Sequence, residues 1–237
     1  MEEIITEKHS FNISDGTSMA SYCAKPKDDK KHPGIIVFQE AFGVNRHIKD
    51  ITQRFARLGF ISIAPELFHR TAHEFEGSYD NFEGVRQHVQ AVMVEGLIKD
   101  TDAVYRWLMN NPQLKENQIA SVGYCLGGKV SFLANTSFKL NAAISYYGGG
   151  MTALLEKADN IQAPQLMFWG GLDKHIDDKQ ISAVINALKE NNKKYVNVIF
   201  SEAGHGFNCD VRASFNSDAS KQAWALAKEF LNTYISF

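Results

Sequence analysis

Apolar and polar residues follow one another along the chain with two different periods, which are typical of strands and of helices. The run Gly34–Phe38 is short, continuous and β-branched, as in a strand buried within a parallel sheet. From Arg46 to Leu58 apolar residues instead recur at helical spacing, and Gly59 follows where such a helix would stop. The two periods alternate along most of the sequence.

This alternation predicts an α/β fold. The expected strands cover 9–14, 17–24, 34–38, 60–64, 119–122, 142–146, 165–169 and 195–200, and the expected helices cover 46–58, 85–110, 126–136, 178–191 and 217–235. Strands joined by helical crossovers run parallel, so we expect a mostly parallel central sheet with helices on both faces. The sequence has no internal repeat or second linker, which favours one domain over residues 1–237.

The segment 66–84 is the longest part of this pattern without a clear period. It is rich in histidine, aromatic and acidic residues. Long irregular segments between regular elements often carry binding residues. We therefore expect 66–84 to form a substrate-binding loop or lid.

Composition and charge narrow the classes of function. With 237 residues and 44% hydrophobic content, the chain can bury one large core, and its formal charge of -2 leaves no basic footprint for nucleic acid. Residues 1–14 are charged and lack an apolar run, which predicts no membrane contact and a cytoplasmic location. We expect a monomer or small homo-oligomer that acts on a small molecule, without a cofactor. Three cysteines with no CxxC pair favour free thiols.

The sequence Gly123-Tyr-Cys125-Leu-Gly127 joins an expected strand to an expected helix. It has the form of a nucleophile elbow with cysteine as the nucleophile. Side chains at 123 or 127 would collide with the neighbouring strand and helix, and the helix N-terminus favours negative charge on sulfur or on an oxyanion. Alternatively, the pattern is a plain strand-to-helix turn around a small buried residue.

Two further residues complete a possible catalytic triad. Asp173 follows the strand 165–169, and His205 lies between two glycines after the strand 195–200. Singly, Asp173 could serve its turn or cap the helix near 178, although Asp177 and Asp178 are better placed to cap. The chain order Cys125, Asp173, His205 is that of the α/β-hydrolase fold, with each member after a different strand. We therefore expect that fold and a Cys-His-Asp triad.

The chain resembles the dienelactone hydrolase (carboxymethylenebutenolidase) family over nearly its whole length. The likeness rests on Gln39-Glu40-Ala-Phe-Gly43, Gly123-Tyr-Cys-Leu-Gly-Gly128, Gly171-Leu-Asp173, Gly204-His-Gly-Phe207 with the following Asn-Cys-Asp-Val-Arg212, and Ala223-Trp224. It implies that Glu40 contacts the resting Cys125 thiol. It also implies that the backbone N–H groups of Leu126 and Ala41 form the oxyanion hole.

One position departs from the family pattern. Well-studied members bind the substrate carboxylate with an arginine four residues after the catalytic histidine, whereas Cys209 stands there in this chain. Arg86 and Arg212 are other candidates for that contact. Phe42 and Tyr147 are candidate apolar contacts to the substrate.

The resemblance and the triad together indicate acyl transfer to Cys125, followed by hydrolysis of the acyl-enzyme. The substrate would be a lactone or activated ester, or alternatively a thioester or general carboxylic ester. A non-catalytic, redox-sensing role of the Cys125 thiol is a further alternative. A metal held by His69, His73 and Glu74, or by His205 and Cys209, is disfavoured because these pairs lie in irregular or glycine-containing segments, so we expect no metal.

Overall fold

The computed structural model describes residues 3–237, which fall into two compact units. The first holds the described residues up to Ala120 together with Ser236–Phe237, and the second holds Ser121–Ile235. Eight strands form a sheet in the order β1-β2-β4-β3-β5-β6-β7-β8, and β5 (Leu114–Tyr124) spans the boundary between the units. The predicted α/β fold with a mostly parallel sheet is confirmed.

The first unit begins with an antiparallel hairpin of β1 (Ile4–Asn12) and β2 (Ser18–Pro26). β4 (Ile61–Pro65) pairs antiparallel with β2 and parallel with β3 (His32–Phe38). β1 starts at residue 4 rather than at the predicted residue 9. Its side chains are exposed or half-buried throughout, so the strand lacks the apolar residues that mark a buried strand in a sequence.

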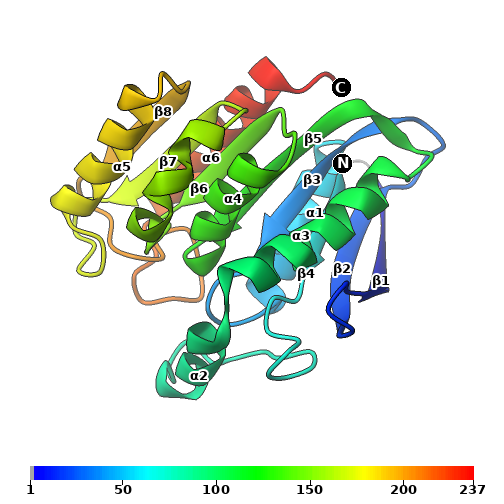
Figure 1. The fold of residues 1–237 in the computed structure, drawn as a ribbon, viewed down its shortest axis with the longest axis horizontal. Helices are drawn as coiled ribbons and strands as arrows, with labels where there is room; N and C mark the ends of the chain where they lie inside the picture. Colours follow the sequence, from blue (N-terminus) through cyan, green and yellow to red (C-terminus); the bar gives the residue numbers. More distant parts are fainter. Residues whose placement is uncertain (1–2) are drawn as a thin grey trace. The chain divides into compact units, whose positions relative to one another are not determined.

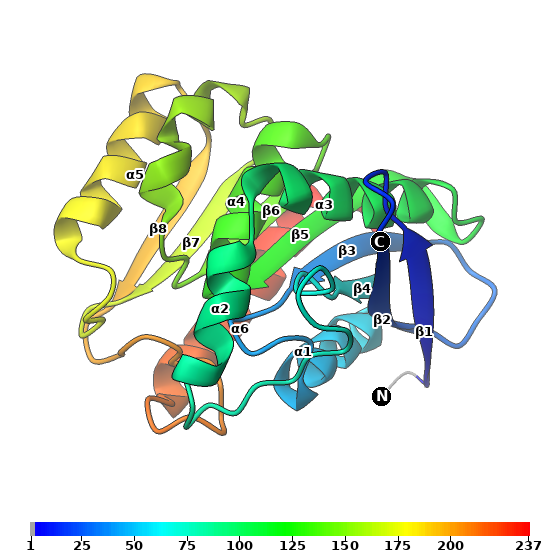
Figure 2. The same ribbon diagram turned by 60° about the horizontal axis from the view of Figure 1, so that its bottom comes forward.

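Helix α1 (Arg46–Arg57) confirms the predicted helix at 46–58. The side chain of Asn45 caps it by accepting a 3.2 Å hydrogen bond from the Ile48 N–H, and Gly59 follows the last turn with φ +97°. Within this unit, α1 covers one face of the strands, and α3 (Val94–Met109) covers the other (Figures 1 and 2).

The helix predicted at 85–110 is two helices, which corrects the sequence interpretation. α2 (Glu83–Ala91) ends at an extended residue, Val92 (φ −75°, ψ 114°), and Met93 (φ −103°, ψ 145°) precedes α3. An unbroken helix that buried Val85 would direct Leu97 to a different side, yet both side chains are buried. The two extended residues shift the helical phase so that α2 and α3 can each bury their own apolar face.

The second unit contains three parallel strands, β6 (Ala142–Tyr146), β7 (Gln165–Gly170) and β8 (Tyr195–Phe200). Helices α4 (Leu126–Ser137) and α5 (Asp178–Glu190) cover one face, and α6 (Ser217–Tyr234) covers the other (Figure 1). All of these elements lie at their predicted places, within a few residues. The sequence did not predict the 3₁₀ helix η1 (Met151–Asn160), which has no 3.6-residue period to detect.

The segment 66–84 is irregular, as predicted, up to the start of α2 at Glu83. Gly43 is fixed to it by an isolated bridge to Glu76, and a Cβ atom on Gly43 would lie 1.9 Å from the carbonyl oxygen of Phe75. Within the residues that the structure describes, no helix is both long and apolar enough to cross a membrane.

Candidate active site

The backbone at Cys125 has the sharp turn of a nucleophile elbow. Cys125 lies between β5 and α4 with φ 54° and ψ −115°, a conformation that L residues rarely adopt. A Cβ atom on Gly123 would lie 1.8 Å from the Gly127 carbonyl oxygen, and one on Gly128 would lie 2.7 Å from the Cα of Gly148. The steric constraint predicted for Gly123 is thus present, and Gly128 has a similar constraint.

Within the second unit, the three predicted triad residues form a continuous chain of contacts. The Nε2 atom of His205 lies 3.1 Å from the Cys125 Sγ, and the Nδ1 atom lies 2.7 Å from Oδ2 of Asp173. The Asp173 side chain is 1% exposed and the His205 side chain 13%, whereas Cys125 is partly exposed. Of the two side chains behind the sulfur, the carboxylate is thus the more deeply buried.

The two oxygens of Asp173 have separate tasks. While Oδ2 faces His205, Oδ1 accepts hydrogen bonds from the backbone N–H groups of His175 (2.8 Å) and Ile176 (3.2 Å). The turn function that we set against catalysis for Asp173 is thus present together with the histidine contact. Sequence reasoning missed these two donors, although the turn-forming aspartate two and three residues before them is a signal for such bonds. The helix cap is Asp177, as predicted, in a capping box with Gln180.

Hydrogen bonds and charges hold the Asp173–His205 pair in its ionised form. Burial alone would raise the pKa of Asp173, but the hydrogen bond and charge of His205, with the two backbone N–H donors, hold it below its ordinary value. Burial alone would lower the pKa of His205, but the contacts with Asp173 and Cys125 raise it to about 10. With this raised pKa the His205 ring carries a proton on both nitrogens at neutral pH.

Two of the four candidate substrate contacts lie beside the triad. The Tyr147 ring is 5.2 Å from the His205 ring and is fully buried, with φ 38° at its backbone. The Arg212 guanidinium lies against Gly206, where a Cβ atom would be 2.3 Å from Nη1. Turns from Gly206 to Cys209 and from Cys209 to Arg212 bring the arginine back to this point. Cys209 itself is buried.

The N–H of Leu126 is at the start of α4, directly after Cys125. The first N–H groups of an α-helix have no acceptor within the helix, and the helix dipole adds a partial positive charge there. Such an N–H favours a nearby negative charge, and the family resemblance assigns it to the oxyanion hole.

The other candidate residues belong to the first unit. Glu40 is fully buried, and its Oε2 accepts a 2.9 Å hydrogen bond from the Tyr79 hydroxyl, which in turn accepts one of 2.9 Å from Asn45 Nδ2. Ala41 and Phe42 are buried in an apolar cluster with Val85 of α2. Sequence reasoning did not identify Tyr79 as the partner of Glu40.

Arg86 has a different setting from the other candidates. It lies on α2 with its side chain 55% exposed, and its Nε is 3.3 Å from a carboxylate oxygen of Glu83. Of the candidate substrate contacts, it is the most exposed to solvent, and its charge is partly offset by its neighbour.

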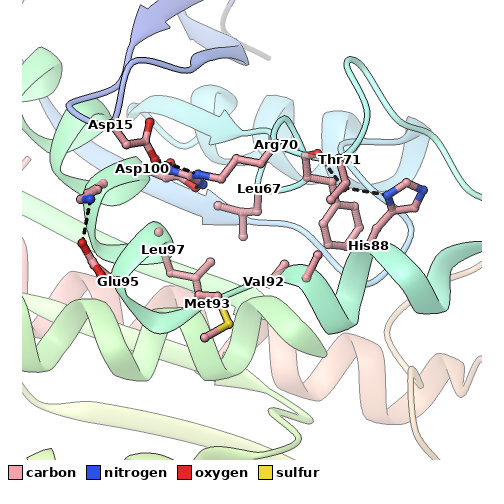
Figure 3. A pocket seen from close by; sticks show the side chains of 14 residues that line it. Asp15, Leu67, Arg70, Thr71, His88, Val92, Met93, Glu95, Leu97 and Asp100 are labelled. Carbon is pink, nitrogen blue, oxygen red and sulfur yellow. Dashed lines mark hydrogen bonds and ion pairs between the residues drawn. The ribbon is translucent and has the colours of Figure 1, made fainter.

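A cavity of about 230 Å³ occupies the first unit (Figure 3). Leu67, Phe68, Arg70 and Thr71 of the 66–84 segment line part of it, together with residues of α2, α3 and the β1–β2 turn. The guanidinium of Arg70 makes hydrogen bonds of 2.7 to 2.9 Å to Asp15 and Asp100, as Figure 3 shows. Because two carboxylates already surround this cation, it is poorly suited to binding an anionic substrate.

The metal sites that the sequence disfavoured have other partners in the structure. His69 Nε2 lies 3.0 Å from Asp100 Oδ1, and the Glu74 carboxylate pairs with the ammonium of Lys8. Among the described residues, neither of the two sets considered in the sequence forms a group of three donors that could hold an ion.

Comparisons with known proteins identify the family of the chain. The sequence profile of the Dienelactone hydrolase family matches residues 19–235. A Synechocystis protein provisionally named carboxymethylenebutenolidase is 32% identical over 228 residues, which are 91% of this chain and 92% of the relative. A Yersinia pestis protein with the same provisional name is 34% identical over 221 residues, which are 89% of this chain and 82% of the relative.

A comparison with solved structures finds the same family. The crystal structure of a provisionally identified dienelactone hydrolase from Klebsiella pneumoniae is 29% identical, with a TM-score of 0.88 over 98% of this chain and 100% of that one. The family profile includes the segments of Cys125, Asp173 and His205, so its match does not depend on one motif. The chain belongs to the dienelactone hydrolase family and is a hydrolase.

Proposed function

We propose that this protein hydrolyses lactones or activated esters with Cys125 as nucleophile, His205 as proton carrier and Asp173 as the partner of His205. The observation that carries the proposal is the 3.1 Å approach of His205 Nε2 to the Cys125 Sγ, with Asp173 at 2.7 Å on the other ring nitrogen. In this arrangement Asp173 occupies Nδ1 of the imidazole, so the proton exchanged with the sulfur or the substrate is the one on Nε2. Asp173 orients the ring and stabilises its charge.

The first half-reaction transfers the acyl group to sulfur. The Cys125 thiolate forms a bond to the carbonyl carbon, and the carbonyl oxygen becomes an oxyanion beside the Leu126 N–H. The C–O bond to the leaving alkoxide then breaks, and the alkoxide takes the Nε2 proton of His205. The raised pKa of His205 supports this step, because the imidazole holds the required proton at neutral pH.

The second half-reaction releases the acid. Neutral His205 takes a proton from water, whose oxygen attacks the thioester carbon, and the C–S bond breaks. The sulfur leaves as a thiolate and the imidazolium is restored, so the cycle closes without a redox partner. Because thiolates are good leaving groups, we expect lactones, enol esters and thioesters to react faster than ordinary alkyl esters.

Residues of the first unit would complete the site. We propose that the N–H of Ala41 is the second oxyanion donor and that Glu40 contacts the resting Cys125 thiol, as the family likeness implies. The bond from Tyr79 to Glu40 supports a fixed position of this carboxylate. On this proposal residues 1–237 act as one domain, which agrees with a family profile that spans both units.

The candidate substrate contacts beside His205 are the cation of Arg212 and the ring of Tyr147, which is fully buried and packs against the His205 ring. Since the Arg212 guanidinium lies against Gly206, next to the catalytic histidine, we propose that it binds an acidic group of the substrate. Phe42 and Arg86 remain weaker candidates, because one is buried in an apolar cluster and the other is exposed on α2.

The decisive experiment is detection of the acyl-enzyme. The wild-type protein is mixed with p-nitrophenyl acetate, a lactone or an acyl thioester and quenched within the first turnover, and its intact mass is measured. We expect one acyl adduct on wild type and none on Cys125→Ala, with the adduct mapped to the peptide that contains Cys125. Cys23→Ala serves as the matched control, because Cys23 is a buried thiol far from the triad in sequence.

Two results would overturn this proposal. Unchanged turnover in Cys125→Ala would exclude the nucleophile. Absence of both an adduct and a product burst with all three substrate classes, combined with ready peroxide oxidation of Cys125, would favour the redox-sensing alternative.

A further inference from the structure

The inward face of the β1–β2 hairpin gathers four polar side chains. Glu7 lies opposite Cys23 in the strand register, and His9 lies opposite Ser21. Directly opposed residues of an antiparallel pair share one face, and residues two apart on a strand share it too. Glu7, His9, Ser21 and Cys23 therefore lie side by side, and all of them belong to the first unit.

We propose that Glu7, His9 and Cys23 bind a divalent cation of the zinc class. Their ligand atoms, a carboxylate oxygen, an imidazole nitrogen and the thiol sulfur, all lie within 4.8 Å of one another. In a tetrahedral zinc site with bonds of about 2.0 to 2.3 Å, the ligand atoms are about 3.3 to 3.8 Å apart. His9 Nε2 and Glu7 Oε1 are 3.8 Å apart, so small rotations of the side chains suffice.

Buried polar atoms on this face point to a ligand. Among the described residues, neither His9 Nε2 nor the Ser21 hydroxyl has a hydrogen-bond partner, although both atoms are buried. Such an atom costs about 1 to 3 kcal/mol when it is left unpaired. An ion would use the free nitrogen, and a water on that ion could take the bond of Ser21, which is only 2% exposed.

The surroundings fix the donors in place. The His9 ring packs against Trp107 of α3, with ring centroids 4.7 Å apart, and Cys23 is fully buried in β2. Two of the three donors thus have little freedom to turn away. Only the Glu7 carboxylate must move, because it lies 3.5 Å from Lys25 Nζ. Lys25 also donates a 3.2 Å hydrogen bond to Gln113, which can hold the ammonium when Glu7 turns to the ion.

The mixture of donors selects the ion. Thiolate and imidazole together favour zinc over calcium or magnesium, which prefer all-oxygen sites. One thiolate and one carboxylate balance the two positive charges of the ion. Three protein donors leave a fourth position for water.

The test is a titration with Co²⁺, followed by competition with Zn²⁺, on the full chain with Cys125→Ala as background. That background removes the Cys125 thiol, which lies 3.1 Å from His205 Nε2. We expect one Co²⁺ per chain with the near-ultraviolet absorption of a thiolate–cobalt bond. Cys23→Ala should abolish this absorption, and His9→Gln should weaken binding by about a hundredfold.

The matched variant is Lys25→Gln. If Lys25 competes with the ion for Glu7, removing its charge should tighten binding by about tenfold, an effect that a merely structural role of the hairpin would not produce. Thermal unfolding of each variant, and ester hydrolysis by the His9 and Lys25 variants with Cys125 present, serve as folding controls. The thiolate–cobalt absorption does not depend on whether the proposed hydrolysis is correct.

Three results would overturn the proposal. One is the absence of a thiolate–cobalt absorption in the Cys125→Ala protein. Another is an absorption that persists in Cys23→Ala. The third is cobalt binding that His9→Gln and Lys25→Gln leave unchanged while both variants remain folded.

Discussion

Cys125 with His205 and Cys23 with His9 are cysteine–histidine pairs in different backbone settings. Cys125 is partly exposed on a strained turn at a helix N-terminus, and His205 reaches it from a loop eighty residues later in the chain. Cys23 is buried in a regular antiparallel ladder, where its direct partner Glu7 lies two residues before His9. A reactive thiol needs access and an unusual backbone, whereas a ligand thiol needs only a fixed position.

The carboxylate makes the second difference between the two pairs. Asp173 contacts Nδ1 of His205 and leaves Nε2 for the sulfur, so the three groups lie in a line along which a proton can move. Glu7 lies 3.8 Å from Nε2 of His9, the same nitrogen that has no partner among the described residues. There the three groups converge on one point. The same residue types can thus form a relay or a chelate, depending on which ring nitrogen the carboxylate approaches.

The largest expected effect is a loss of kcat on substitution of one histidine and not of the other. His205→Gln should lower kcat for an activated ester by about 10³-fold or more, because the ring carries the proton in both half-reactions. His9→Gln should stay within about twofold of wild type. Steady-state kinetics of both variants test this, and equal losses would remove the distinction between the two pairs.

Backbone conformation gives the next test, through glycine and alanine at each cysteine. At residue 125, with φ 54°, glycine should be more stable than alanine by about 1 to 3 kcal/mol, because it relieves the strain. At residue 23, inside β2, alanine should be more stable than glycine by about 1 kcal/mol. Urea unfolding of the four variants measures both differences. The same sign at both positions would refute the strained-turn account.

Each pair also has a neighbouring cation, and the two cations should act differently. Arg212→Gln should raise KM for an ester with a carboxylate group by about tenfold and leave a neutral ester unchanged, since a lost surface-accessible charge contact is worth about 1 kcal/mol. Lys25→Gln should change neither KM. The comparison requires kinetics with a matched pair of charged and neutral esters, and an equal rise for both esters would exclude binding of an acidic group by Arg212.

The remaining test of the comparison is a pH dependence of stability. The pKa of His205 rises from 6.5 to about 10 on folding, so its stabilising contribution is complete below pH 6.5 and is lost as the pH rises towards 10. The advantage of wild type over His205→Gln should therefore shrink between pH 6.5 and pH 10. Urea unfolding at several pH values measures it, and an advantage that grows with pH would contradict the raised pKa.

The sequence was most informative where a residue has one conformation-specific task. Gly123, Cys125 and His205 could be predicted because a glycine-bounded nucleophile after a strand and a glycine-bounded histidine after a later one are rare patterns. The break at Val92 and Met93 could not, because both helices have good helical composition and only tertiary burial separates their phases.

Two further features could not be predicted, for a common reason. The Glu7, His9 and Cys23 cluster joins residues of two strands whose register is known only from the fold, and no local spacing links them. Likewise, the return of Arg212 to Gly206 depends on consecutive turns whose directions the sequence does not determine.

The two-residue joint between α2 and α3 has a consequence for engineering. Met93 is 69% exposed. Val92 makes the last bond of α2, from its N–H to the Val89 carbonyl, and Met93 accepts the first bond of α3 from the Leu97 N–H, so residues added between Val92 and Met93 would interrupt neither helix. Variants that lengthen or shorten this joint would move α2, which packs on Ala41 and Phe42. The residues of the Cys125 turn and His205 would stay the same. Libraries that aim to change substrate range can therefore vary chain length here rather than residue identity at the nucleophile.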